Sequence, residues 1–256
     1  MTKKTILITG ATSGFGKATA ERFAGPAWRL ILIGRRADRL ASIKKELTKK
    51  TDVLTFTLDV RNRSKVTALF KSLPQEYSCI DVLLNNAGLA LGLEPAYEVS
   101  LDDWDTMIDT NIKGLVYCTR TILPGMVKRN SGLIINIGSV SGSWPYPGGN
   151  VYGATKAFVQ QFSRNLRSDL LGTNVRVTNI EPGMAETEFS IVRFKGDRQK
   201  AGKFYENTKS LSAADIANIV WWLANLPEHV NINQLEVMPT CQAWGPFAVY
   251  REGKQA

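Results

Sequence analysis

The segment between Gly138 and Lys156 holds side chains whose types and spacing could move a proton to a carbonyl oxygen. Tyr152 and Lys156 are four residues apart, so on a helix they share one face. An ammonium group beside a phenol stabilises the phenolate and lowers the tyrosine pKa from about 10 towards neutral pH. Such a tyrosine could protonate a carbonyl oxygen, to which Ser139 could donate a second hydrogen bond. On its own, a Tyr-x-x-x-Lys spacing is mostly structural, so the motifs and elements around it decide whether the pair is catalytic.

A glycine-rich segment, residues 9–16, lies between the first apolar run and the first helical stretch. Its three glycines permit a tight turn and the close approach of a phosphate, and the following helix N-terminus offers free N–H groups. A purely structural turn is the alternative. A Walker-type phosphate loop does not fit, because it needs glycine at Ala11 and serine or threonine at Ala18. The segment therefore favours a dinucleotide site.

Two arginines, Arg35 and Arg36, follow the second apolar run. An acidic residue at this place usually holds a ribose 2′-hydroxyl, whereas arginine accommodates a 2′-phosphate through its planar fork of donors. Asp38 lies beyond the end of the run, where capping a helix is its expected use. The pair predicts NADP(H) rather than NAD(H). The alternative is a solvated basic pair.

Short β-rich apolar runs alternate with longer helical stretches along the chain. We expect strands at residues 5–9, 30–34, 53–58, 80–84, 133–137 and 175–180, with helices at about 17–24, 35–50 and 64–73. Strands this apolar, each followed by a helix, imply a parallel sheet covered on both faces. We therefore expect an α/β fold, with a single Rossmann-type doubly wound parallel sheet. Since no repeat or linker divides the chain, this sheet would form one domain over residues 1–256.

The composition narrows the classes of partner. The chain has 256 residues, is 44% hydrophobic and 21% charged, and carries a formal net charge of +9. Residues 1–50 hold 12 Lys+Arg against 3 Asp+Glu, while the remainder holds 20 of each. A basic segment could meet nucleic acid, an anionic surface or a phosphorylated ligand. No nucleic-acid motif accompanies this basic segment. Because it contains Arg35 and Arg36, we interpret its excess of positive charge as a sign of a phosphorylated cofactor.

Other classes lack support in the sequence. No apolar run approaches the ~20 residues of a membrane span, and no secretory signal is visible, so we expect a cytoplasmic protein without a membrane partner. Cys79, Cys118 and Cys241 lack metal-ligand spacing, and we expect neither a zinc site nor a disulfide framework. We expect no metal.

Further motifs follow the glycine turn in a fixed order. Asp59 comes after the third predicted strand, residues 85–88 read Asn-Asn-Ala-Gly after the fourth, and Pro182-Gly183 follows the sixth. With Asn111, Ser139, Tyr152 and Lys156 between them, these motifs resemble the short-chain dehydrogenase/reductase family over essentially the whole chain. The resemblance implies an NADP-dependent oxidoreductase acting on alcohol or carbonyl groups.

The resemblance also implies residue roles. Tyr152 would be the acid/base, Lys156 a ribose ligand that lowers the tyrosine pKa, Ser139 a carbonyl-orienting donor and Asn111 the holder of a relay water. Asp59 and Val60 would contact adenine, and Thr187 would meet the nicotinamide amide or phosphate. The expected NADP(H)-binding residues are Gly10, Thr12, Ser13, Gly14, Phe15, Gly16, Arg35, Arg36, Asp59, Val60, Asn86, Gly88, Tyr152, Lys156, Pro182, Gly183 and Thr187.

Longer stretches, residues 86–92, 142–152 and 230–233, resemble one NADP-dependent branch that reduces short anionic aldehydes or oxidises the matching hydroxy acids. Within it, residues 182–187 and 242–244 look more like the sulfoacetaldehyde reductases, with isethionate as product, than the 3-hydroxy acid dehydrogenases, which reduce malonic semialdehyde. Both alternatives stay open.

The expected substrate residues combine the proton-transfer site with a segment of about 184–210, which in this family closes over the substrate. They are Ser139, Trp144, Tyr146, Met184 and Arg193. Arg193 could pair with the sulfonate or carboxylate. The alternatives are a solvated charge at Arg193 and ordinary core or interface roles for the others.

A tail of about residues 241–256, with Trp244, Phe247 and Tyr250, suggests contact with another subunit, and the resemblance implies a homotetramer. The alternative is a tail folded onto its own chain. A rival function from another class is a catalytically silent protein that senses NADP(H). That function predicts a damaged catalytic set, whereas all four residues are present.

Overall fold

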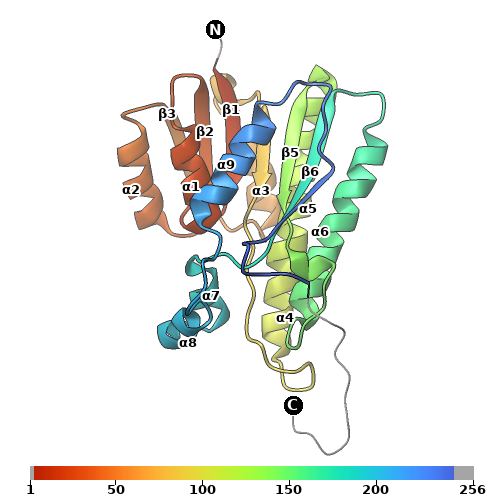
Figure 1. Ribbon diagram of the computed structural model, residues 1–256. Coiled ribbons are helices and arrows are strands. Elements are labelled where there is room, and N and C mark those ends of the chain that lie inside the picture. The colour runs from red at the N-terminus through yellow and green to blue at the C-terminus, as the bar shows by residue number, and fades with distance from the viewer. Residues whose placement is uncertain (1–2, 245–256) are drawn as a thin grey trace, which may run out of the picture.

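The computed structural model describes residues 3–244, and in it seven strands form one parallel sheet in the order β3-β2-β1-β4-β5-β6-β7 (Figure 1). The strands are β1 Lys4–Thr9, β2 Trp28–Gly34, β3 Asp52–Thr57, β4 Val82–Asn85, β5 Gly132–Ile137, β6 Val175–Pro182 and β7 Gln234–Val237. The doubly wound parallel sheet predicted from the sequence is confirmed. The tail beyond residue 244, for which a subunit contact is predicted, lies outside the described residues.

The sequence pattern missed one strand, β7. Its residues Gln-Leu-Glu-Val are all only half-buried, because β7 is the last of the described strands in the sheet and pairs with β6 alone among them. An edge strand with two polar residues in four lacks the continuous apolar character that identified the other six. β4 also begins at Val82, two residues later than predicted.

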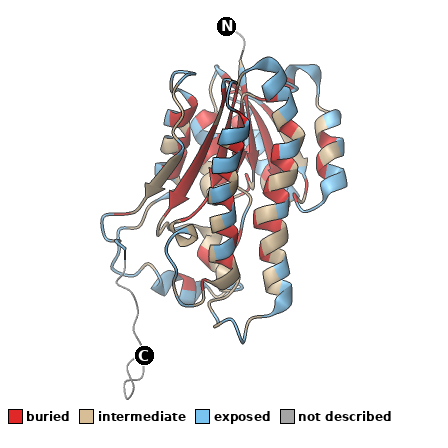
Figure 2. Ribbon diagram, turned by 90° about the vertical axis from the view of Figure 1, so that its right-hand side faces the viewer, coloured by how far each residue is buried: buried red, intermediate tan, exposed pale blue. Residues whose placement is uncertain are grey.

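Helices cover both faces of the sheet (Figures 1 and 2). They are α1 Gly14–Phe23, α2 Ala37–Leu47, α3 Arg63–Lys71, α4 Leu101–Ile108, α5 Leu115–Arg129, α6 Asn150–Asp169, α7 Glu188–Arg193, α8 Arg198–Lys203 and α9 Ala213–Ala224. Short 3₁₀ turns lie at η1 Gln75–Tyr77 and η3 Val140–Gly142, and a π-helical segment, η2, spans Asp109–Gly114. Among the described residues, no helix is long and apolar enough to cross a membrane.

Alternation along the strands divides the core into two layers. Ile6 and Ile8 of β1 pack in one buried cluster with residues of α1, α2 and α9. Leu7, between them, packs in the second cluster with residues of α3, α5 and α6. This is the period of two expected of a strand buried on both faces.

The chain order changes direction between β1 and β4. From β1 the sheet grows one way through β2 and β3, and the other way through β4 to β7. In open parallel sheets a ligand binds outside the carboxyl ends of the strands at such a switch point. Every strand is parallel, so the residues that follow β1, β2, β4, β5 and β6 meet at this one edge. α7 and α8 also lie at this end of the sheet (Figure 1).

Candidate active site

A cavity of about 750 Å³ lies at the carboxyl ends of the strands. The structure brings nearly all of the sequence-predicted site residues to its wall. The exceptions are Gly16 and Asn111, which lie behind the lining. The lining includes Gly10, Thr12, Ser13, Gly14, Phe15, Arg35, Arg36, Asp59, Val60, Asn86, Gly88, Ser139, Trp144, Tyr146, Tyr152, Lys156, Pro182, Gly183, Met184, Thr187 and Arg193.

Tyr152 lies in the first turn of α6 and is only 8% exposed. The hydroxyl of Ser139, the residue that caps η3 after β5, faces that of Tyr152, and its Oγ donates to Oγ of Ser141 at 3.0 Å. Burial raises the pKa of Tyr152 to about 12, although the Arg193 guanidinium and the Ser139 hydroxyl act in the opposite direction. In the protein without a bound cofactor, the phenol therefore carries its proton at neutral pH, the form that can act as an acid.

Lys156 lies one helical turn after Tyr152, and its Nζ is 5.7 Å from the centre of the tyrosine ring. The ammonium donates a 2.8 Å hydrogen bond to the carbonyl oxygen of Ile137, at the end of β5. The side chain is buried, and burial lowers the pKa of Lys156 to about 8. The shared helix face is as predicted, but the lowered tyrosine pKa is not found here, because both groups lie in the same buried environment.

Asn111 lies in η2, the π-helical segment between α4 and α5, rather than in a regular α-helix. Its Nδ2 donates to the carbonyl of Leu89 at 2.9 Å and to Oγ1 of Thr155 at 3.0 Å, and its Oδ1 accepts from the Leu89 N–H at 2.9 Å. Asn111 therefore ties the segment after β4 to α6, directly behind the cavity. Single π-helical turns are frequent at functional sites.

The turn after β1 has the backbone that its glycines permit. Gly10 and Gly14 adopt φ of +67° and +50°. At Gly16 a Cβ would lie 2.6 Å from Nδ2 of Asn86 and against the carbonyl of Gly10. Asn86 in turn donates from Nδ2 to the Thr9 carbonyl at 2.9 Å and the Gly10 carbonyl at 3.1 Å. The turn is thus held close to the segment after β4, with the N-terminus of α1 open to the cavity.

The two arginines after β2 differ in their contacts. Arg36 donates to Oγ1 of Thr12 at 2.8 Å and to Oγ of Ser13 at 2.6 Å, and it forms an ion pair with Glu188 at 2.9 Å. Arg39 forms a second ion pair with the same carboxylate at 2.7 Å. Burial would raise the pKa of Glu188, but the hydrogen bonds from the two arginines outweigh it and lower that pKa.

Arg35 is exposed and also lines the cavity. Its charge acts on Asp59, which has a 2.7 Å ion pair with Arg61. Burial would raise the pKa of Asp59, yet the hydrogen bonds and charges of Arg61 and Arg35 lower it. Both arginines predicted to meet a 2′-phosphate therefore lie at the cavity, although Arg36 shares its donors with Glu188.

Arg193, the last residue of α7, is directed into the cavity. Its Nη2 donates to the Tyr146 hydroxyl at 2.9 Å, and its guanidinium carbon lies 5.0 Å from the centre of the Tyr152 ring. The Nε is buried with no hydrogen-bond partner among the described residues. Lys195, two residues later, instead forms a 2.7 Å ion pair with Asp103 outside the cavity wall.

The edge of the cavity is formed by two tryptophans and one carboxylate. Trp144 and Trp244 donate from Nε1 to the two oxygens of Glu236 at 2.9 and 3.1 Å. Gln242 accepts from the backbone N–H of Met184 at 2.7 Å and so joins this edge to the segment before α7. Residues 238 and 241–244 thus line the cavity together with residues 182–185, 187–190 and 192–193.

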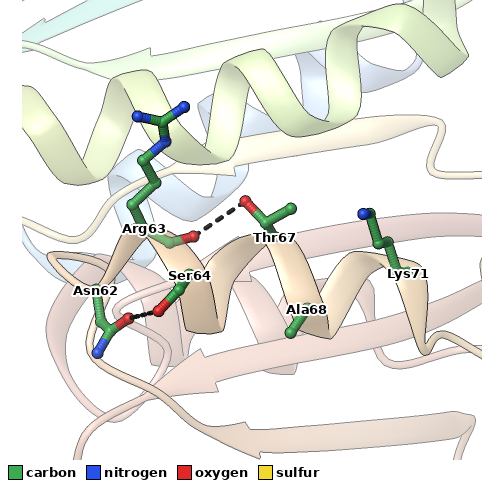
Figure 3. Close-up of a pocket in the computed structure, with 6 residues that line it drawn as sticks. All are labelled: Asn62, Arg63, Ser64, Thr67, Ala68 and Lys71. Carbon is green, nitrogen blue, oxygen red and sulfur yellow. Dashed lines mark hydrogen bonds between the residues drawn. The ribbon is translucent and has the colours of Figure 1, made fainter.

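A second, shallow groove runs along α3 and is separate from this site (Figure 3). Three of its polar side chains, those of Asn62, Ser64 and Thr67, bond within the helix and its cap. Ser64 donates to Asn62, which caps the helix, and Thr67 donates to the carbonyl of Arg63. These contacts explain the groove as part of a capped surface helix.

Comparison with known proteins identifies the family. Residues 4–197 match the model of the short chain dehydrogenase family. The chain belongs to this family. Short chain dehydrogenases similar to it include the NADP-dependent 3-hydroxy acid dehydrogenase YdfG of Salmonella typhi, 61% identical over 96% of this chain and 99% of the relative. Sulfoacetaldehyde reductase 2 of Chromohalobacter salexigens is 54% identical over 96% of this chain and 98% of the relative.

Solved structures agree with this assignment. The closed form of serine dehydrogenase complexed with NADP+ superposes with a TM-score of 0.94 at 57% identity, covering 97% of this chain and 100% of that one. An alcohol dehydrogenase from the archaeon Thermococcus sibiricus, complexed with 5-hydroxy-NADP, has a TM-score of 0.83 at 26% identity, covering 95% of this chain and 100% of that one.

The short chain dehydrogenase motifs did not reveal every residue at the cavity. Glu188 and Arg39 form the cluster with Arg36, and Gln242 holds Met184. A signal existed for Arg39, since it lies three residues after Arg36 and shares its helix face. Nothing local in the sequence connects Glu188 with arginines about 150 positions earlier.

Proposed function

We propose that this short chain dehydrogenase transfers hydride from NADPH to a short anionic aldehyde. One observation carries the choice of an anionic substrate: the Arg193 guanidinium enters the cavity beside Tyr152 without a carboxylate partner among the described residues. Arg193 is half-buried, and a partly buried cation is stabilised by an opposite charge, which a carboxylate or sulfonate would supply.

The residues at the cavity fit NADP(H). The glycine turn leaves no Cβ in the path of a phosphate at the start of α1, and Arg35 and Arg36 lie where a 2′-phosphate is held in this fold. The Lys156 ammonium is buried with one carbonyl acceptor, so it has donors left for ribose hydroxyls. When NADPH is bound, it supplies a hydride to the carbonyl carbon of the substrate.

The chain's own residues would manage the proton and the charge. Tyr152 holds a proton on its hydroxyl and would give it to the carbonyl oxygen, which the Ser139 hydroxyl would orient. Lys156 would stabilise the phenolate that remains, and Arg193 would hold the anionic end of the substrate. Asn111 would fix the backbone behind the cavity through Leu89.

Replacing Tyr152 with phenylalanine tests the mechanism. Turnover of a short anionic aldehyde should be abolished, while fluorescence titration should show NADPH binding nearly intact. Retained turnover would exclude Tyr152 as the acid. NADPH binding without turnover in the unsubstituted protein would instead favour a silent NADP(H) sensor.

Two anionic aldehydes are candidates for the substrate. Sulfoacetaldehyde, reduced to isethionate, is supported because the two segments with the sulfoacetaldehyde-reductase pattern supply the cavity residues Met184, Gln242 and Trp244. A 3-hydroxy acid such as that formed from malonic semialdehyde is supported by the higher overall identity, 61% against 54%. We favour sulfoacetaldehyde, because local pocket residues bear more directly on specificity than identity spread over the chain. The ratio of kcat/KM for sulfoacetaldehyde to that for malonic semialdehyde, measured with NADPH, decides between the two substrates.

We also propose that the chain is one domain, works in the cytoplasm and assembles as a homotetramer. The proposal is supported by the family resemblance. Sedimentation equilibrium would test the assembly, and a monomer at micromolar concentration would contradict it.

A further inference from the structure

The surroundings of Arg193 are built from aromatic rings rather than carboxylates. Its guanidinium carbon lies 5.0 Å from the centre of the Tyr152 ring, 5.2 Å from that of Phe189 and 5.8 Å from that of Tyr146. The Tyr146 hydroxyl accepts from Nη2 at 2.9 Å, and Nε is buried without a partner in residues 3–244. Aromatic faces stabilise a cation and fix its position, but they do not neutralise its charge.

Tyr152 faces charged or titratable groups from three parts of the chain. Lys156 approaches from its own helix at 5.7 Å, Arg193 approaches from α7, and Tyr146 lies in the loop before α6. Ser139 adds a neutral hydroxyl. Lys156 is directed to the carbonyl of Ile137, whereas the Nε donor of Arg193 has no partner in the part of the chain that the structure describes. Arg193 is thus the cation near Tyr152 that is ready to take an anion.

We propose that Arg193 couples the negative charge of the substrate to the proton on Tyr152. A cation at this distance favours the phenolate, so an anion seated on the guanidinium removes part of that effect and keeps the proton on the phenol. During reduction the proton then leaves the tyrosine oxygen for the carbonyl oxygen as the hydride reaches the carbonyl carbon. This inference rests on the proposed function, in which Arg193 holds the substrate anion.

Because of this coupling, a neutral substrate differs from an anionic one in its effect on the protonation of Tyr152 as well as in its affinity. Without an anion on Arg193, the phenolate is favoured more strongly, so as the pH rises the acid needed for reduction is lost at a lower pH. For charges 5–7 Å apart in a partly buried site, the titration of Tyr152 should move by about one pH unit between anionic and neutral substrates.

The test compares the oxidation of 3-hydroxypropanoate with that of 3-hydroxypropanamide, its neutral counterpart of the same length. The pH profile of kcat/KM reports the enzyme before the substrate binds, and that of kcat reports the complex with substrate. We expect the two kcat/KM profiles to coincide and the kcat profile of the anion to lie about one pH unit higher. If product release limits kcat, the rate of hydride transfer in a single turnover is measured in its place. Coincident profiles in the complex would overturn the coupling.

Arg193→Gln separates this inference from the proposed function. It should lower kcat/KM for the anion at least tenfold relative to the amide, and it should also bring the two kcat profiles together. If the ratio does not fall, Arg193 does not hold the anion and the proposed function fails. If the ratio falls but the profiles of the unsubstituted enzyme already coincide, only the coupling fails. Arg193→Lys should restore the separation in part.

A spectroscopic measurement follows the proton without turnover. The ultraviolet difference between the unsubstituted protein and Tyr152→Phe is titrated with pH, with and without propanoate or ethanesulfonate. Either anion should move the midpoint of the Tyr152 phenolate upwards, and the shift should vanish in Arg193→Gln. Tyr146→Phe, which keeps the ring but loses the 2.9 Å hydrogen bond to Arg193, should reduce the shift. An equal shift in Arg193→Gln would overturn the proposal.

Discussion

Replacing Lys156 with methionine should make the cofactor-free protein more stable at neutral pH. The pKa of Lys156 is lowered from an ordinary 10.5 to about 8 by burial, which corresponds to roughly 3 kcal/mol of unfavourable free energy for the buried charge. Methionine has a similar length and no charge. It leaves the Ile137 carbonyl without its 2.8 Å donor, which costs about 1 kcal/mol. The net gain at pH 7 is therefore about 2 kcal/mol.

The gain should depend on pH with a definite sign. Between pH 8 and 10.5 the unfolded chain binds a proton at Lys156 that the folded protein has released. Stability of the unsubstituted protein therefore rises with pH through this window, relative to the variant. Below about pH 8 the full cost of the buried charge is present. At pH 10.5 the variant should have lost its advantage and be about 1 kcal/mol less stable, because only the lost hydrogen bond remains.

Urea unfolding of both proteins at pH 7 and pH 10.5, without cofactor, measures the difference. Lys44→Met, on the exposed face of α2, is the matched control and should change little at either pH. The reasoning is refuted if Lys156→Met is less stable at pH 7. It is also refuted if its effect on the free energy of unfolding is the same at both pH values.

Three further variants test the cofactor site and its support. Gly16→Ala places a methyl group against the backbone of the glycine turn and should weaken NADPH binding and cost roughly 1–3 kcal/mol of stability, whereas Gly25→Ala, with nothing within 4 Å, should do neither; equal melting temperatures would contradict this. Arg35→Ala with Arg36→Ala should weaken NADPH binding tenfold or more and NADH binding much less, and equal losses in titration would show that the pair does not hold a phosphate. Asn111→Ala removes three hydrogen bonds of 2.9–3.0 Å and should lower the free energy of unfolding by roughly 2–4 kcal/mol, which an unchanged urea midpoint would disprove.

The fold and the centre of the candidate site were predictable because their signals are local. Four-residue spacing alone puts Tyr152 and Lys156 on one helix face, and the apolar runs alone predict six of the strands. The edge strand β7 was missed because its residues are half-buried. The protonation of Tyr152 was not predictable either, because it depends on how deeply the phenol and Lys156 are buried together.

Contacts between distant segments account for most of what the sequence did not predict. Glu188 meets Arg36 across 152 positions of chain, and Gln242 meets Met184 across 58. Arg193 was predicted as a substrate residue, but its aromatic surroundings depend on how α7 packs against the loop before α6. Such pairings arise from the way the chain closes around the cavity, and no short pattern encodes them.

The double ion pair of Glu188 joins two sides of the cavity that belong to separate parts of the fold. Arg36 and Arg39 lie at the start of α2, and Glu188 lies at the start of α7. A dinucleotide that leaves or enters between these sides requires the ion pairs to separate. Dissolved salt weakens partly exposed ion pairs of this kind. Raising the ionic strength should therefore loosen the contact between the starts of α2 and α7.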